Sequence, residues 1–186
     1  STFAYAVYKE IAKLSNDEIN ENDVMLDVFT YDAVYVKELG ALGRKVDISD
    51  SIIYLLNQNS KLENVVNSYE IEEDLKFSKN IGEYDVVSLI HKLQFTPQPQ
   101  KVLCEIHSVL RNNGRLMLTL DQEPLFKRVF EFAQSLYKRF VKKELVNVYE
   151  NSKNYKIGPK NHYSKRMIKK MLIKAGFKKL KLEVKY

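Results

Sequence analysis

The sequence is poor in the residues and segments that mark several classes of protein. It has one cysteine in 186 residues, Cys104, so no disulfide can form within the chain. Cys104 lies in an apolar helical stretch, and we expect it to be a small buried residue. No stretch contains the ~18 consecutive apolar residues of a membrane span, and the N-terminus lacks a basic region followed by an apolar segment. We therefore expect no membrane partner, no signal peptide and a cytoplasmic location.

Glycine is scarce as well, and it is missing where one local pattern requires it. Residues 24–49 read VMLDVFTYDAVYVKELGALGRKVDIS. A short apolar strand, a turn, an amphipathic helix and a second short strand follow one another, as in a nucleotide-cofactor βαβ unit. The first turn of such a unit needs glycine, so that the backbone can bend sharply and approach the ligand. The turn here is Phe-Thr-Tyr-Asp-Ala, at 29–33. The layout predicts a cofactor, whereas the loop predicts that it binds abnormally or not at all.

The rest of the pattern predicts an α/β protein. Strand-like and helix-like segments alternate along the chain, which favours a Rossmann-like, doubly wound, mostly parallel sheet with helices on both faces. The run YDVVSLI at 84–90 is nearly all apolar, as in a parallel strand that is covered on both sides. We expect one domain over 1–186, with an N-terminal helix within 1–20. We expect strands at 24–28, 45–48, 64–69, 84–90, 115–120 and 177–185, and helices at 3–14, 33–42, 51–58, 98–110, 123–146 and 165–175.

Positive charge is concentrated near the C-terminus. Residues 137–186 carry a net charge of +13, and residues 1–136 carry −7. This part of the domain contains a predicted basic helix, which indicates an anionic partner such as a nucleic acid or an acidic protein. The alternative is an ordinary solvated surface. The candidate binding residues on this helix are Lys165, Arg166, Lys169, Lys170 and Lys174.

Three stretches together resemble a known family. They are 24–49, then YDVVSLIHKLQFTPQPQKVLCEIHSVLRNNGRLMLTL at 84–120, and HYSKRMIKKMLIKAGFKKLKLEVKY at 162–186. Over about 20–186 the chain resembles a class I S-adenosylmethionine-dependent methyltransferase of the methyltransferase type 11 kind. The resemblance implies the class I methyltransferase fold, S-adenosylmethionine as cofactor, and a methyl acceptor that the sequence does not identify.

The resemblance also implies where the cofactor loop lies. The family's Gly-x-Gly-x-Gly turn falls on Phe29, Tyr31 and Ala33, so two rings stand where the cofactor's methionine and ribose would approach. Asp27 matches the acid that ends the first strand in the family. Each of these matches also has a structural interpretation, in which the residue serves only the fold.

Two further acids match cofactor positions of the family. Asp47 ends the predicted second strand, where the family places an acid on the ribose hydroxyls, because a carboxylate can accept two hydrogen bonds from a diol. With this assignment the second strand is about three residues shorter than usual. Glu73 or Asp74 would lie near the adenine amino group. The alternative for each is a solvated loop acid.

Catalytic residues are less evident. His91 follows the predicted fourth strand and faces the expected crevice, where it could act as a base or orient a nucleophile. A lone histidine after a buried strand is more often structural. The three histidines and Cys104 have no metal-like spacing, so we predict no metal site.

Two functions follow from these patterns. The first is a divergent S-adenosylmethionine-dependent methyltransferase that uses Asp27, Asp47 and the altered 29–33 loop. The second is a methyltransferase-derived module without catalytic activity, whose basic C-terminal part binds a nucleic acid or an acidic protein.

Overall fold

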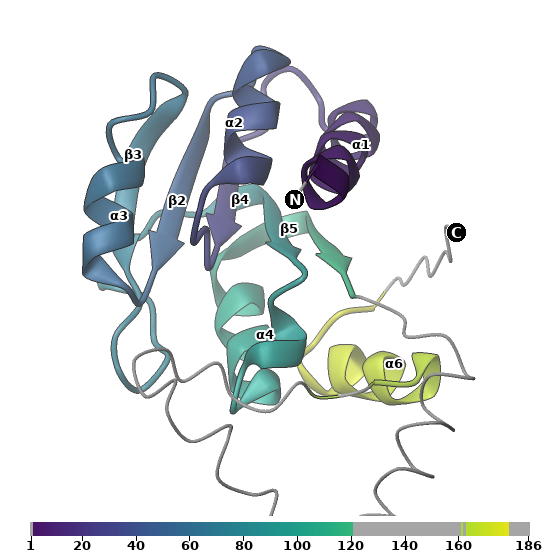
Figure 1. Ribbon diagram of the computed structural model, residues 1–186. Coiled ribbons are helices and arrows are strands. Elements are labelled where there is room, and N and C mark those ends of the chain that lie inside the picture. The colour runs from purple at the N-terminus through teal and green to yellow at the C-terminus, as the bar shows by residue number, and fades with distance from the viewer. Residues whose placement is uncertain (1, 121–160, 162, 179–186) are drawn as a thin grey trace, which may run out of the picture.

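The computed structural model describes residues 2–120, 161 and 163–178 of the chain. Its centre is a five-stranded sheet in the order β3-β2-β1-β4-β5, and every neighbouring pair in it is parallel (Figure 1). The strands are β1 Met25–Val28, β2 Val46–Asp50, β3 Val65–Glu70, β4 Tyr84–Ile90 and β5 Leu110–Thr119.

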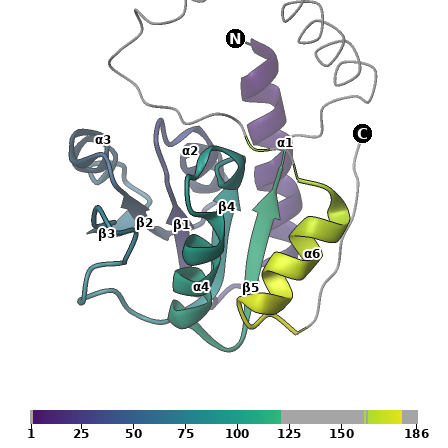
Figure 2. The same cartoon turned by 90° about the horizontal axis from the view of Figure 1, so that it is seen from below.

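Helices cover both faces of this sheet. Seen along the sheet from below, α1, α2 and α3 lie on one side of it, and α4 and α6 lie on the other (Figure 2). The described helices are α1 Thr2–Glu18, α2 Val34–Ala41, α3 Ile53–Asn59, α4 Pro99–Val109 and α6 Lys165–Lys174, with a 3-10 turn, η1, at Leu93–Phe95. The prediction of a Rossmann-like α/β fold with a parallel sheet is confirmed.

Each face of the sheet has its own hydrophobic cluster. Side chains alternate between the two faces along a strand, so Leu26 and Val28 of β1 join one cluster and Met25 joins the other. Val86 and Val87 of β4 divide in the same way. This explains why β4 is apolar throughout: it lies between two layers of helices and has no solvated face.

Most predicted elements lie within two residues of their expected bounds, but two of the predictions cannot be compared. The helix expected at 123–146 and nearly all of the strand expected at 177–185 lie outside the described residues. No described helix is long and apolar enough to cross a membrane.

The prediction of a buried Cys104 is wrong, since the structure places this residue on the exposed side of α4. The helix buries Val102, Leu103, Ile106 and Val109. These positions follow the three-to-four-residue spacing of one helix face, and Cys104 falls outside it. An apolar stretch therefore located the helix but did not fix the orientation of each residue in it.

The strand order places a candidate site. From β1 the chain runs outward to β2 and β3, then crosses back so that β4 lies on the other side of β1. The connections after β1 and β4 thus leave the sheet in opposite directions. In open parallel sheets this arrangement forms a crevice beyond the carboxyl ends of the two strands, where ligands bind. Residues that follow Val28 and Ile90 are therefore the first to consider.

Candidate cofactor site

The loop after β1 has a left-handed backbone at three alternating residues. The φ angles are 56° at Phe29, 52° at Tyr31 and 56° at Ala33. These are the three positions at which the sequence comparison placed the family's glycines. A residue with a Cβ pays roughly 1–2 kcal/mol in this conformation. The loop therefore keeps a backbone suited to glycine while carrying other residues.

Hydrogen bonds hold the centre of this loop from both sides. The Tyr31 N–H donates to Oδ2 of Asp50 at 2.7 Å. The Tyr31 carbonyl oxygen accepts from Nδ2 of Asn59 at 2.6 Å. One residue earlier, the Thr30 N–H donates to the Ser49 carbonyl oxygen at 3.3 Å. A strained conformation persists when its surroundings fix it in several ways, as they do here.

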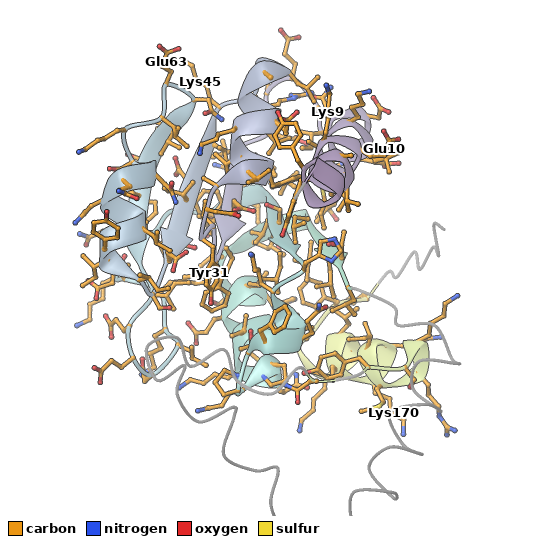
Figure 3. The ribbon with its side chains drawn as sticks, viewed as in Figure 1. Lys9, Glu10, Tyr31, Lys45, Glu63 and Lys170 are labelled. Atoms are coloured by element: carbon orange, nitrogen blue, oxygen red, sulfur yellow. The ribbon has the colours of Figure 1, made fainter. Side chains whose placement is uncertain are left out.

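The three side chains of the loop take different directions. Phe29 is buried in the cluster beneath α4 and α6, together with Val28 and Leu93. Ala33 is buried in the opposite cluster, beneath α1 and α2. Tyr31 is half-buried at the end of the sheet toward which the strand arrows point (Figure 3), and the Lys92 ammonium lies 4.4 Å from the centre of its ring. Of the two aromatic rings, that of Tyr31 is the more exposed to solvent.

Asp27 is a buried acid on β1 beside this loop. It is 4% exposed, and its Oδ1 accepts a hydrogen bond of 2.5 Å from the Ser88 hydroxyl. Burial raises the pKa of Asp27 to about 6, although the bonds from Ser88 and Thr30 and the charge of Lys92 oppose the rise. Burial has the largest effect because it disfavours the charged form. Asp27 therefore changes its charge near neutral pH.

Asp50, and not Asp47, is the acid at the carboxyl end of β2. The strand runs from Val46 to Asp50, and its last residue pairs with Glu70 at the end of β3. Asp50 accepts from the Tyr31 and Ile52 N–H groups at 2.7 and 2.9 Å, one with each carboxylate oxygen. Burial raises the pKa of Asp50, against the effect of these hydrogen bonds. The position assigned to Asp47 in the sequence analysis is wrong by three residues.

Asp47 lies near the other end of the strand and has structural partners. It pairs with Leu26, in the middle of β1. Its carboxylate accepts a 2.9 Å hydrogen bond from the Tyr84 hydroxyl and further bonds from the backbone and side-chain nitrogens of Asn67. It joins β2 to β3 and β4 through these bonds. The strand expected at 45–48 thus ends two residues later, at Asp50.

Asp74 lies in the loop after β3 and pairs with two lysines. Its Oδ2 is 3.0 Å from Nζ of Lys76 and 3.8 Å from Nζ of Lys101. The acid that ends β3 is Glu70, which is exposed. The predicted role of Asp74 beside an adenine stays a prediction, and Glu70 is the acid that the strand ends bring next to Asp50.

His91 is the first residue after β4 and also has a left-handed backbone, with φ at 55°. Its N–H donates to the carbonyl and hydroxyl oxygens of Thr119, at the end of β5. Its ring meets the ring of Tyr8 edge to face, with 5.9 Å between centres. Tyr8 belongs to α1, so this helix reaches the end of the sheet where the crevice opens. The predicted catalytic role of His91 stays a prediction.

These residues surround a small cavity. Its lining includes Asp27 of β1, Phe29 and Thr30 of the loop after β1, Lys92 of the loop after β4, and Tyr8 of α1. Its volume of about 10 Å³ accommodates roughly one water molecule. Pockets for small ligands are usually about 300–1,000 Å³. The backbone and the acids thus have the form of a cofactor site, while the side chains leave room for a water molecule only.

The predicted basic residues lie on the exposed side of α6. All five of them are exposed, whereas Ile168 and Leu172 on the opposite side are buried. Figure 3 shows Lys170 extending from α6 away from the sheet. This surface is separate from the crevice. Among residues 2–120, 161 and 163–178, no group of three or more His, Cys, Asp or Glu side chains could hold a metal ion.

Comparison with known proteins identifies the domain. A family model described as a methyltransferase domain matches residues 30–118, which run from the loop after β1 to the end of β5. The match covers just under half of the chain, and the fold of the chain is that of class I methyltransferases. No curated protein matches the sequence.

Solved methyltransferases share this fold at low identity. The magnesium protoporphyrin IX methyltransferase of Synechocystis PCC 6803, solved with bound S-adenosylhomocysteine, is 14% identical, with a TM-score of 0.64 over 93% of this chain and 73% of its own. An S-adenosylmethionine-dependent methyltransferase of Thermotoga maritima is 14% identical, with a TM-score of 0.60 over 96% and 72%. An amino pentose methyltransferase of Micromonospora echinaspora, solved with S-adenosylmethionine, is 16% identical, with a TM-score of 0.52 over 63% and 52%. The methyltransferase domain described here therefore spans about half to three quarters of these chains.

The sequence analysis missed three residues of this site: Asp50, Glu70 and Lys92. A signal for Asp50 was present, because the second strand, expected at 45–48, was shorter than usual. Glu70 is the last residue of a strand whose end was placed one residue early. Lys92 belongs to no sequence motif. It lies over the Tyr31 ring only because of the path that the chain takes after β4.

Proposed function

We propose that this protein is an S-adenosylmethionine-dependent methyltransferase that binds its cofactor beyond the carboxyl ends of β1, β2 and β4. The observation that carries the proposal is the loop backbone, which is left-handed at Phe29, Tyr31 and Ala33. A chain that had lost its cofactor would have no evident reason to keep this costly conformation.

The acids at the strand ends support the same site. Asp50 would hold the ribose once the groups that bury it move, because backbone N–H groups of Tyr31 and Ile52 fix its carboxylate at the end of β2. Glu70, its exposed neighbour at the end of β3, would face the adenine. The cofactor supplies an electrophilic methyl group, and transfer to an acceptor needs chiefly proximity and orientation.

Cofactor binding requires side chains to move, since the cavity accommodates about one water molecule. The Phe29 ring is packed in the core and lines the cavity, together with Tyr8 and Lys92. The Tyr31 ring lies under the Lys92 ammonium, which is 4.4 Å from the ring centre. Tyr31 and Lys92 are half-buried, which leaves them a route toward solvent. We propose that the Tyr31 ring turns outward when the cofactor enters, while the Lys92 ammonium stays at the crevice.

Two aspartates of one strand provide a matched test. Asp50→Asn should weaken S-adenosylhomocysteine binding about tenfold or more, because removing one partner of charge-assisted hydrogen bonds costs about 1.5–3 kcal/mol. Asp47→Asn should leave the affinity within about twofold, although it lowers stability, because its partners are Asn67 and Tyr84. Calorimetric titration, with urea unfolding of each variant, separates affinity from folding. An equal loss of affinity in the two variants would contradict the proposed site.

A second candidate function rests on the basic side of α6, where five cations are exposed. We propose this surface as a site for an anionic partner, either a nucleic acid or an acidic protein. Charge reversal at Lys169, Lys170 and Lys174 should abolish a salt-dependent interaction, measured by fluorescence anisotropy with labelled RNA, DNA and a polyglutamate peptide. Absence of binding at low salt by the unmodified chain would exclude this function.

A further inference from the structure

Lys92 places a cation at the opening of the crevice. It follows β4 by two residues and lines the same cavity as Asp27 and Phe29. Its ammonium lies 4.4 Å from the centre of the Tyr31 ring, at one of the loop's glycine positions. A cation over an aromatic face is attracted by the electron density of the ring.

Two buried carboxylates share this region with Lys92. Asp27 is 4% exposed and Asp50 is fully buried. The positive charge of Lys92 lowers the pKa of both acids, against the effect of burial. The crevice therefore contains a positive charge of its own before any ligand enters.

We propose that Lys92 determines the charge preference of the crevice, disfavouring a cationic sulfonium ligand relative to the neutral thioether of the same shape. The inference rests on the proposed function. S-adenosylmethionine and S-adenosylhomocysteine differ by one methyl group and by the positive charge on sulfur. A fixed cation within about 6–10 Å of that sulfur, at an effective dielectric constant near 20, would change their relative affinity on the order of 10- to 100-fold.

The test compares four full-length proteins with both ligands. Lys92→Met removes the charge and keeps most of the aliphatic chain, whereas Lys92→Arg keeps the charge. Lys37→Met removes an exposed lysine that does not line the cavity, and whose Nζ donates to the Asp32 carbonyl oxygen. Calorimetry gives the ratio of the dissociation constants for S-adenosylmethionine and S-adenosylhomocysteine in each protein. Lys92→Gln repeats the test if the methionine variant does not fold.

The inference is supported if Lys92→Met shifts the ratio of dissociation constants by tenfold or more in favour of S-adenosylmethionine. Lys92→Arg and Lys37→Met should keep the ratio of the unmodified protein. Binding of S-adenosylmethionine by the methionine variant alone also supports it. The inference is overturned if both ligands bind and Lys92→Met leaves the ratio unchanged, while the proposed function then stands. If none of the proteins binds either ligand at millimolar concentration, the proposed function fails as well.

Discussion

Tyr31 adopts a left-handed backbone because its neighbours fix both of its peptide groups. The Asp50 carboxylate accepts its N–H, and the Asn59 amide donates to its carbonyl oxygen. These bonds offset the unfavourable φ of 52°. A residue without a Cβ would adopt the same backbone at no steric cost.

Substitution of Tyr31 by glycine and by alanine measures this strain. Both variants lose the ring, so their difference isolates the backbone. Tyr31→Gly should be more stable than Tyr31→Ala by about 1 kcal/mol, the reverse of the order in helices and strands. Urea unfolding of the two variants provides the comparison, and an alanine variant at least as stable as the glycine variant would show that the loop is not left-handed here.

The raised pKa of Asp27 predicts that the stability of the protein depends on pH. In the folded state its pKa is about 6, compared with about 4 in an unfolded chain. Between these values the folded state binds more protons, so the contribution of Asp27 to stability falls as the pH rises from about 4 to about 6 and is constant above. Asp27→Asn has no such charge and should gain up to about 3 kcal/mol over the parent protein across this window. Urea unfolding at pH 4, 5, 6 and 7 measures the gain, and a gain that does not vary with pH would contradict the assigned pKa.

Sequence reasoning succeeded at the loop but placed one acid wrongly. The three positions onto which the family's glycines were laid, 29, 31 and 33, all have a left-handed backbone. Asp47 was chosen because it was taken as the end of the second strand, where the family places an acid. The residue at a strand end depends on pairing with the neighbouring strand, and Val28 pairs with Ser49, so the strand continues to Asp50. Pairing of this kind has no local sequence signal.

At the scale of elements, α6 illustrates how a helix is positioned by its two ends. Ser164 caps its first turn: the Ser164 hydroxyl oxygen accepts a hydrogen bond of 3.2 Å from the Met167 N–H. Its last turn ends before Gly176, whose φ is +108°. A Cβ at Gly176 would lie 2.8 Å from the His107 ring, which itself packs edge to face on Phe177. The glycine therefore permits α6 to meet α4.

Three glycine substitutions, one at this junction and two elsewhere in the fold, separate backbone strain from crowding. Gly176→Ala should destabilise the protein most, because it introduces both a left-handed alanine and a clash with His107. Gly43→Ala, where φ is +79° and no atom lies within 4 Å of the new Cβ, should cost about 1 kcal/mol. Gly82→Ala has open space and should change stability by no more than about 0.5 kcal/mol. Thermal unfolding orders the three variants, and a Gly176→Ala variant as stable as Gly82→Ala would contradict the packing of α6 on α4.

The same elements show why the fold could be predicted while details of the site could not. The apolar run of β4 and the face of apolar residues on α4 are local signals, and both elements were located from the sequence. The contact between Tyr8 of α1 and His91 after β4 joins residues 83 positions apart. The position of Lys92 over Tyr31 depends likewise on the whole sheet.

At the scale of the whole molecule, the crevice brings together the ends of strands that lie far apart in the sequence. Asp27, Asp50 and Glu70 come from three successive strands, and His91 and Lys92 follow a fourth. Of these residues, Asp27 and Lys92 line the small cavity, together with the rings of Tyr8 and Phe29. The central claim is that this crevice still binds the cofactor of the fold, through an aromatic loop that keeps the backbone of a glycine loop.

The most direct test is a thermal-shift titration of the full chain with S-adenosylmethionine and S-adenosylhomocysteine, followed by calorimetry. Ligand at 100 times its dissociation constant should stabilise the folded chain by about 2.7 kcal/mol. For a protein of this size, that raises Tm by roughly 5–10 °C. The account predicts a saturable shift of this size for at least one of the two ligands. No shift and no heat at millimolar concentration would contradict it and would mean that the side chains at the opening keep the crevice closed.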